Sequence, residues 1–236
     1  MKWKGLDIRV KNDIYSPKPA SLVLADVAIK NIKPKEKVLD MCTGSGIVAI
    51  AIAKFIHNVK VTASDINPKS ISITQKNAKI NNVRIKTILA DFYAPFKYNQ
   101  FDIITVHPPA IPYPPKKDWD MPLDMKIATN GGPDGSRLVV RSIVEAKRCL
   151  KNDGKLLLLL PHWSNTKKAY VALKKNYKKI KELASKKVEF FPALEYHPDS
   201  KVLRHVYKLA KNKIIKIEFK NNKPYSNVSV IQAIKK

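Results

Sequence analysis

Cysteine, acidic residues and long apolar runs are scarce in this 236-residue sequence. It has two cysteines, Cys42 and Cys149, which predict neither a disulfide framework nor a metal site. No apolar run is long enough to span a membrane, and the N-terminus lacks the apolar core of a signal peptide. We therefore expect a cytoplasmic protein with no metal and no membrane segment.

The shortage of acids leaves a large positive charge. Aspartate and glutamate number 19 against 45 lysines and arginines, which gives a formal net charge of +26. Such a charge predicts contact with polyanions, above all nucleic acid. Nearly all of it is lysine, however, so AT-rich coding or lysine enrichment at high growth temperature could also produce it.

The clearest motif is Val38-Leu39-Asp40-Met41-Cys42-Thr43-Gly44-Ser45-Gly46, which an apolar run of helical character follows. It predicts a strand, a tight glycine turn and a helix. Glycines fit such a turn because a Cβ would obstruct both the sharp bend and the approach of a ligand. The N–H groups at the start of the helix would face that ligand.

The rest of the chain alternates strands and helices, which predicts an α/β fold: a Rossmann-like, doubly wound, mostly parallel sheet with helices on both faces. We expect helices near 19–30, 68–81 and 135–150, and strands near 37–41, 59–64, 84–89, 101–106 and 155–160. Beyond these we expect a helix at 166–184, strands at 187–191 and 202–210, and a hairpin of 214–219 with 228–234. We expect three parts of the chain: an N-terminal strand and helix segment (1–36), a core (37–165) and a basic C-terminal part that completes the same domain (166–236).

Three acids, Asp40, Asp65 and Asp91, fall where successive predicted strands end. At that edge of an open α/β sheet ligands bind. Asp65 lies 19 residues after Gly46, where an acid accepts hydrogen bonds from ribose hydroxyls. Asp91 with Phe92 could hold an adenine ring, and Asp40 could attract a ligand ammonium. Each acid could instead cap the next helix.

The fourth strand ends in His107-Pro108-Pro109-Ala110. A dinucleotide enzyme does not require this segment, and Ala49 stands where the third glycine of a dinucleotide loop would be. Together these motifs resemble class I S-adenosylmethionine-dependent methyltransferases, and most closely the HemK-like and small-domain groups that methylate planar nitrogens. Gly131-Gly132-Pro133-Asp134-Gly135 and Tyr15-Ser16-Pro17-Lys18-Pro19 also match that group.

The resemblance implies S-adenosylmethionine as cofactor and assigns residues to its site. The implied cofactor-binding residues are Asp40, Thr43, Gly44, Ser45, Gly46, Asp65, Ile66, Asp91 and Phe92. The implied catalytic residues are His107, Pro108 and Pro109, and the implied substrate-binding residues are Tyr15, Pro17, Ala110, Tyr113 and Trp119.

The catalytic segment departs from the family pattern Asn-Pro-Pro-Tyr. Neutral His107 can accept one hydrogen bond from a target nitrogen, or remove its proton as a general base, or only cap the strand. Ala110 cannot stack on a target, so Tyr113, Trp119 or Phe92 would have to cover it. The proline-rich loop 111–133, which carries two of these aromatics, would either stack on a flipped-out base or form a lid.

We therefore expect an N-methyltransferase that acts on an exocyclic base amine in ribosomal or transfer RNA. The lysine pairs at 167–168, 174–175, 178–179 and 186–187 would follow phosphates, or else form a solvated face. Two alternatives stay open: a HemK-like enzyme that methylates a release-factor glutamine, and a cofactor- or RNA-binding protein whose catalytic motif has decayed.

Overall fold

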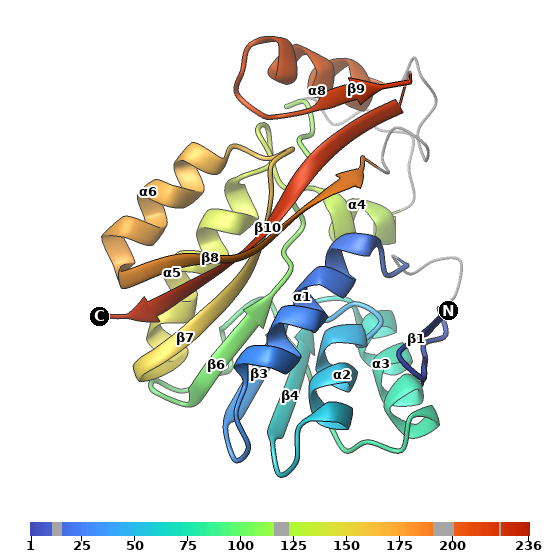
Figure 1. The fold of residues 1–236 in the computed structure, drawn as a ribbon, viewed down its shortest axis with the longest axis vertical. Coiled ribbons are helices and arrows are strands. Elements are labelled where there is room, and N and C mark those ends of the chain that lie inside the picture. Colours follow the sequence, from blue (N-terminus) through green and yellow to red (C-terminus); the bar gives the residue numbers. More distant parts are fainter. Residues whose placement is uncertain (11–15, 116–122, 191–200, 222) are drawn as a thin grey trace.

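The computed structural model describes residues 1–10, 16–115, 123–190, 201–221 and 223–236. A parallel sheet forms the centre of the molecule (Figure 1). Its strands are β3 (Lys37–Met41), β4 (Lys60–Asp65), β5 (Lys86–Leu89), β6 (Phe101–Val106) and β7 (Leu150–Pro161). The strand order is β5-β4-β3-β6-β7-β10-β8, where β10 (Lys223–Lys235) and β8 (Tyr177–Glu189) are antiparallel additions. The expected mostly parallel, Rossmann-like sheet is confirmed.

Helices cover both faces of the sheet because alternate strand residues point to opposite sides. Val38 packs in one core cluster with α1 (Pro19–Asn31), α2 (Ile47–Phe55) and α3 (Pro68–Ile80). Leu39 packs in the other cluster with α5 (Arg137–Cys149) and α6 (Thr166–Asn176). The apolar run of β7 contributes to both clusters, as expected for a central strand buried on two faces.

Local signals place the helices of the parallel part. Asn67 caps α3 by accepting a hydrogen bond from the Lys69 N–H at 2.9 Å, and Pro68 stands at the first helical position. Pro19 likewise begins α1. A short helix, α4 (Leu123–Thr129), interrupts the stretch 111–133 that the sequence predicts as a loop.

Two of the C-terminal elements are predicted wrongly. The helix expected over 166–184 ends at Asn176, and β8 follows as the edge partner of β10. The strand expected over 202–210 is instead α8 (Lys201–Lys211). Its buried residues Val202, Leu203, Val206 and Leu209 recur at helical spacing, which overrides the strand preference of valine.

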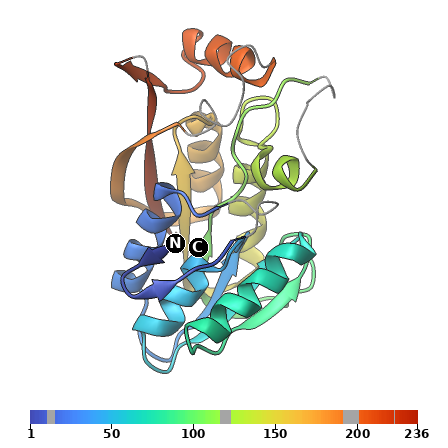
Figure 2. The same ribbon diagram turned by 90° about the vertical axis from the view of Figure 1, so that its right-hand side faces the viewer.

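The end of the chain forms a hairpin at the expected turn, but β9 (Glu218–Lys220) pairs only with residues 223–225 of β10. Residues 228–234, expected to pair with 214–219, pair with β7 and β8 instead. Together α8 and β9 lie beyond the carboxyl ends of β6 and β7, at the top of both views (Figures 1 and 2). At the N-terminus, β1 (Lys2–Trp3) and β2 (Leu6–Asp7) form a small hairpin. In the described part of the chain no helix combines the length and the apolar character needed to cross a membrane.

Candidate active site

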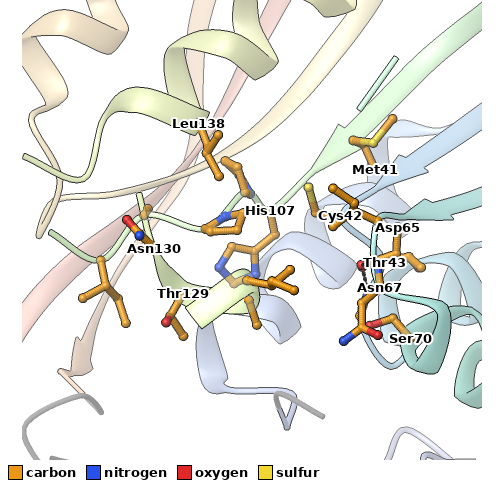
Figure 3. A pocket seen from close by; sticks show the side chains of 18 of the residues that line it. Met41, Cys42, Thr43, Asp65, Asn67, Ser70, His107, Thr129, Asn130 and Leu138 are labelled. Atoms are coloured by element: carbon orange, nitrogen blue, oxygen red, sulfur yellow. Dashed lines mark hydrogen bonds between the residues drawn. The ribbon is translucent and has the colours of Figure 1, made fainter. Parts of the chain in front are cut away.

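A cavity of about 540 Å³ opens at the carboxyl ends of β3, β4 and β6, and α4 forms part of its wall. Its volume is in the range of small-molecule sites. Figure 3 shows His107 between two groups of side chains: Thr129 and Asn130 on one side, and Cys42, Thr43 and Asp65 on the other. We call the side near Thr43 and Asp65 the cofactor half, and the side near His107 the target half. The expected residues Pro17, Ser45, Ile66, Pro108 and Pro109 also line the cavity.

The glycine turn has the sharply bent backbone that the motif predicts. Gly44 and Gly46 have positive φ angles of 56° and 84°. A Cβ on Gly46 would lie 2.8 Å from the Thr74 side chain, whereas a Cβ on Gly44 would meet no atom within 4 Å. Gly44 lines the cavity and Gly46 is not among its lining residues, so Gly46 shapes the turn and Gly44 borders the open space.

Asp65 ties the turn to the neighbouring strand. Its Oδ2 accepts a hydrogen bond from the Gly44 N–H at 2.9 Å, and its Oδ1 accepts one from the Asn67 N–H at 2.9 Å. Burial raises the pKa of Asp65, while these backbone donors act in the opposite direction. The Ile66 N–H and the Ser70 hydroxyl act on the carboxylate in the same direction as these donors, and the side chain lines the cavity.

Asp40 does not reach the cavity, contrary to the prediction that it attracts a ligand ammonium. Its carboxylate accepts hydrogen bonds from Thr43 Oγ1 at 2.7 Å and Thr105 Oγ1 at 2.8 Å, and another from the Ala49 N–H. It therefore caps α2, the alternative that the sequence left open. Burial raises its pKa to about 6.

Asp91 is also engaged within the protein. It pairs with Arg141 of α5, whose Nη1 lies 2.8 Å from Asp91 Oδ1. The same guanidinium lies 4.4 Å from the centre of the Phe92 ring. All three side chains line the cavity, so the expected acid and aromatic ring are present. The carboxylate, however, already has a cationic partner that the sequence motif did not reveal.

His107 follows the last residue of β6, and its side chain is partly buried in the cavity wall. Its Nδ1 lies 3.2 Å from Ser21 Oγ of α1. Burial lowers the pKa of His107 to about 4, so the ring is neutral at physiological pH. A neutral imidazole has one donor and one acceptor nitrogen, and the Ser21 hydroxyl can pair with Nδ1 in either tautomer. No sequence signal connects Ser21 with this site.

Ala110 lines the cavity, and its small side chain offers no ring to a target. Its backbone packs tightly on the 131–135 segment, because a Cβ on Gly135 would lie 2.4 Å from the Ala110 carbonyl oxygen. Tyr113 does not cover a target, contrary to expectation. It is buried, it is not among the lining residues, and its hydroxyl lies 2.8 Å from Thr129 Oγ1. Tyr15 and Trp119 lie outside the described residues.

Trp163, two residues after β7, lines the cavity. It is 8% exposed, and its indole N–H is buried with no hydrogen-bond partner among the described residues. The resemblance to the methyltransferase family did not assign Trp163 to the site. Its position after a strand that ends at the carboxyl edge was the one available signal.

The residues present fit S-adenosylmethionine. The cavity offers a carboxylate (Asp65) and a largely buried aromatic ring (Phe92). Gly44 borders open space that a larger side chain would enter. In the described part of the chain no cluster of histidine, cysteine or acidic residues could hold a metal ion.

Comparisons with known proteins agree with this arrangement. Residues 11–112 match the model of the methyltransferase small domain family. A Methanocaldococcus jannaschii protein, named for a proposed protein N5-glutamine methyltransferase activity, is 30% identical over 187 residues, which are 79% of this chain and 92% of that protein. A release factor glutamine methyltransferase of Moorella thermoacetica is 29% identical over 140 residues, 57% of this chain and 50% of that protein. This chain thus spans about half the length of the Moorella relative.

The fold also occurs in solved structures. The YcgJ protein of Bacillus subtilis superposes with a TM-score of 0.63 at 14% identity, over 91% of this chain and 99% of that one. The fold agrees with the family match and the archaeal relative, and these two identify an S-adenosylmethionine-dependent methyltransferase. The chain belongs to the HemK-like, small-domain group of class I S-adenosylmethionine-dependent methyltransferases.

Proposed function

We propose that this enzyme methylates a planar nitrogen held between His107 and the carbonyl of Pro108. The lone pair of such a nitrogen is delocalised, so acceptors that hold its hydrogens favour the geometry in which it can attack. The observation that carries the proposal is the partly buried His107 ring in the cavity wall, with its Nδ1 engaged by Ser21. Its low pKa supports an acceptor rather than a cation.

Ser21 would hold the ring of His107 in place. When Nδ1–H donates to Ser21 Oγ, the lone pair of Nε2 is free to accept a hydrogen from the target nitrogen. Methyl transfer leaves that nitrogen positively charged and its proton acidic. His107 Nε2 would then take this proton as a general base, which replaces the acceptor role of asparagine in the family motif.

The cofactor, when bound, supplies an electrophilic methyl group. Asp65 would accept hydrogen bonds from its ribose hydroxyls, and Ile66 and Phe92 would border its adenine ring. Arg141 holds Asp91 next to that ring. Asp40 would act indirectly by holding Thr43 and the start of α2 in place.

The target that we propose is the side-chain amide of a glutamine in a protein. The activities named for the two relatives support it, since both are N-methylations of glutamine. A second candidate is an exocyclic base amine in RNA, which the net charge of +26 favours. Both targets are planar nitrogens with two hydrogens, so the same acceptors would serve either one.

Transfer of a radiolabelled methyl group separates the two targets. The enzyme is incubated with full-length release factor from the same organism, and separately with its deproteinised ribosomal and transfer RNA. We expect label in the release factor, and peptide mass spectrometry should place one methyl group on a glutamine. Label in RNA alone would refute the glutamine proposal in favour of the second candidate. Label in neither, with cofactor still bound, would refute both targets.

A further inference from the structure

The unit formed by α8, β9 and their connection, residues 201–220, carries an unusual charge. It contains six lysines and Arg204 against a single acid, Glu218. The apolar face of α8 is buried in the core, so the helix turns its cations outward. Arg204, Lys208 and Lys211 recur at helical spacing of four and three residues and are all exposed.

These three cations have no carboxylate partner in the part of the chain that the structure describes. Other basic side chains do find acids: Lys168 lies 2.7 Å from Asp134, and Lys187 pairs with Glu218. A row of neighbouring cations without counter-charges raises the free energy of the isolated protein. An external polyanion would remove that repulsion.

An aromatic surface lies beside the cations. Phe219 of β9 is 59% exposed, and its ring centre lies 5.6 Å from that of Tyr207 on α8. A large exposed aromatic ring among cations is the combination by which proteins bind single-stranded nucleic acid, because bases stack on the ring while phosphates meet the cations. An acidic protein segment would use the cations but would not need the ring.

The unit is fastened to the rim of the active-site cavity. His205 Nε2 donates to the carbonyl of Pro133 at 2.6 Å, and Pro133 belongs to the 131–135 segment that packs on Ala110. The Lys216 N–H donates to the carbonyl of His162, next to Trp163. A molecule bound on this unit would therefore lie at the same edge of the sheet as the cavity (Figure 1).

We propose that residues 201–220 form a docking surface for single-stranded RNA. Arg204, Lys208 and Lys211 contact its phosphates, and Phe219 stacks on a base. The proposal does not depend on which molecule carries the methylated nitrogen. It is tested by binding alone, so its failure leaves the proposed methyl transfer untouched.

The test is fluorescence anisotropy with a labelled single-stranded oligouridylate, measured over a series of salt concentrations. The variant Arg204→Gln/Lys208→Gln/Lys211→Gln removes three cations from α8. The control Lys167→Gln/Lys174→Gln/Lys175→Gln removes three exposed cations from α6 and changes the net charge equally. We expect the α8 variant to bind about tenfold more weakly and its salt slope to fall by about 2, since each phosphate contact contributes about 0.7. The control should bind nearly as the parent enzyme does.

Phe219→Ser separates RNA from an acidic peptide. Loss of one stacked base should weaken RNA binding about fivefold, and circular dichroism checks that the variants stay folded. A glutamate-rich peptide of equal charge serves as the second ligand and should be insensitive to Phe219→Ser. Equal weakening by the α6 and α8 variants, tighter binding of the peptide than of the RNA, or no effect of Phe219→Ser would each overturn the proposal.

Discussion

The two halves of the cavity differ in how far the protein satisfies its own polar groups. In the cofactor half, Asp65 accepts two backbone hydrogen bonds and Asp91 pairs with Arg141. In the target half, one ring nitrogen of His107 has no partner among the described residues, and elsewhere in the cavity wall the buried indole N–H of Trp163 has none among them. The cofactor half is thus organised in advance, while the target half keeps bonding capacity for a ligand.

The largest effect should come from the target half. His107→Ala removes the acceptor and base, so methyl transfer should slow by about 100-fold. Cofactor affinity should stay within about twofold, because the ring does not take part in the Asp65 network. Single-turnover transfer and calorimetry with S-adenosylhomocysteine measure the two effects.

Two further variants serve as controls for His107. His107→Asn restores the side chain of the family motif and should recover part of the rate. His162→Ala changes a half-buried histidine outside the cavity lining and should leave the rate nearly unchanged. A fully active His107→Ala enzyme would remove His107 from the mechanism.

The cofactor half should show the reverse pattern. Asp65→Asn replaces one carboxylate oxygen by an amide NH₂ group that faces a backbone N–H. Cofactor affinity should fall about 30-fold, since a charged hydrogen bond contributes about 2 kcal/mol. Calorimetry measures the cofactor affinity of the variant and of the parent enzyme.

The matched control for Asp65 is Asp102→Asn. Asp102 also accepts a backbone N–H, from Lys37, but it lies at the opposite end of the sheet. Cofactor affinity should be unchanged in this variant. An equal loss in both variants would mean that Asp65 acts only through stability.

A smaller effect is expected from Ser21→Ala. Without the Ser21 hydroxyl, His107 loses the hydrogen bond that holds its ring, and a loss of about 1 kcal/mol corresponds to a rate about fivefold lower. The loss should lie in kcat and not in cofactor affinity. Ser21→Thr keeps the hydroxyl and should retain most of the rate. If threonine fails as alanine does, the hydroxyl is not what matters.

The pH dependence should show the smallest change. With a pKa of about 4, His107 is already the neutral acceptor throughout the range from about pH 5 to 8, and the rate should decline only as the pH falls toward that pKa. The ordinary value for histidine, 6.5, would instead produce an inflection within that range. Rates of the parent and His107→Asn enzymes are compared across it. An inflection near pH 6.5 that the asparagine variant lacks would contradict the claim that His107 is neutral over this range.

The sequence predicted the parallel half of the fold well because its signals are local. The expected strand 101–106 coincides with β6, and Asn67-Pro68 marks the start of α3. Prediction failed where distant partners decide. Residues 177–189 form a strand because β10 offers an edge to pair with, which no local pattern shows.

The site divides in the same way. The glycine turn and Asp65 follow from motif spacing, whereas the state of Asp40 depends on Thr105, which is 65 residues away, and that of Asp91 on Arg141. Ser21, which faces His107 from α1, had no signal at all because its partner is 86 residues distant. Tyr113 carried an aromatic side chain at a suitable place in the loop, but packing buried it.

A crystal structure with bound S-adenosylhomocysteine tests the account most directly. We predict the adenosine in the cofactor half, with its ribose hydroxyls on Asp65 and its adenine ring against Phe92. The sulfur should point toward His107 and the carbonyl of Pro108. A ligand whose sulfur points away from His107, or one bound outside this cavity, would contradict the assignment of the two halves.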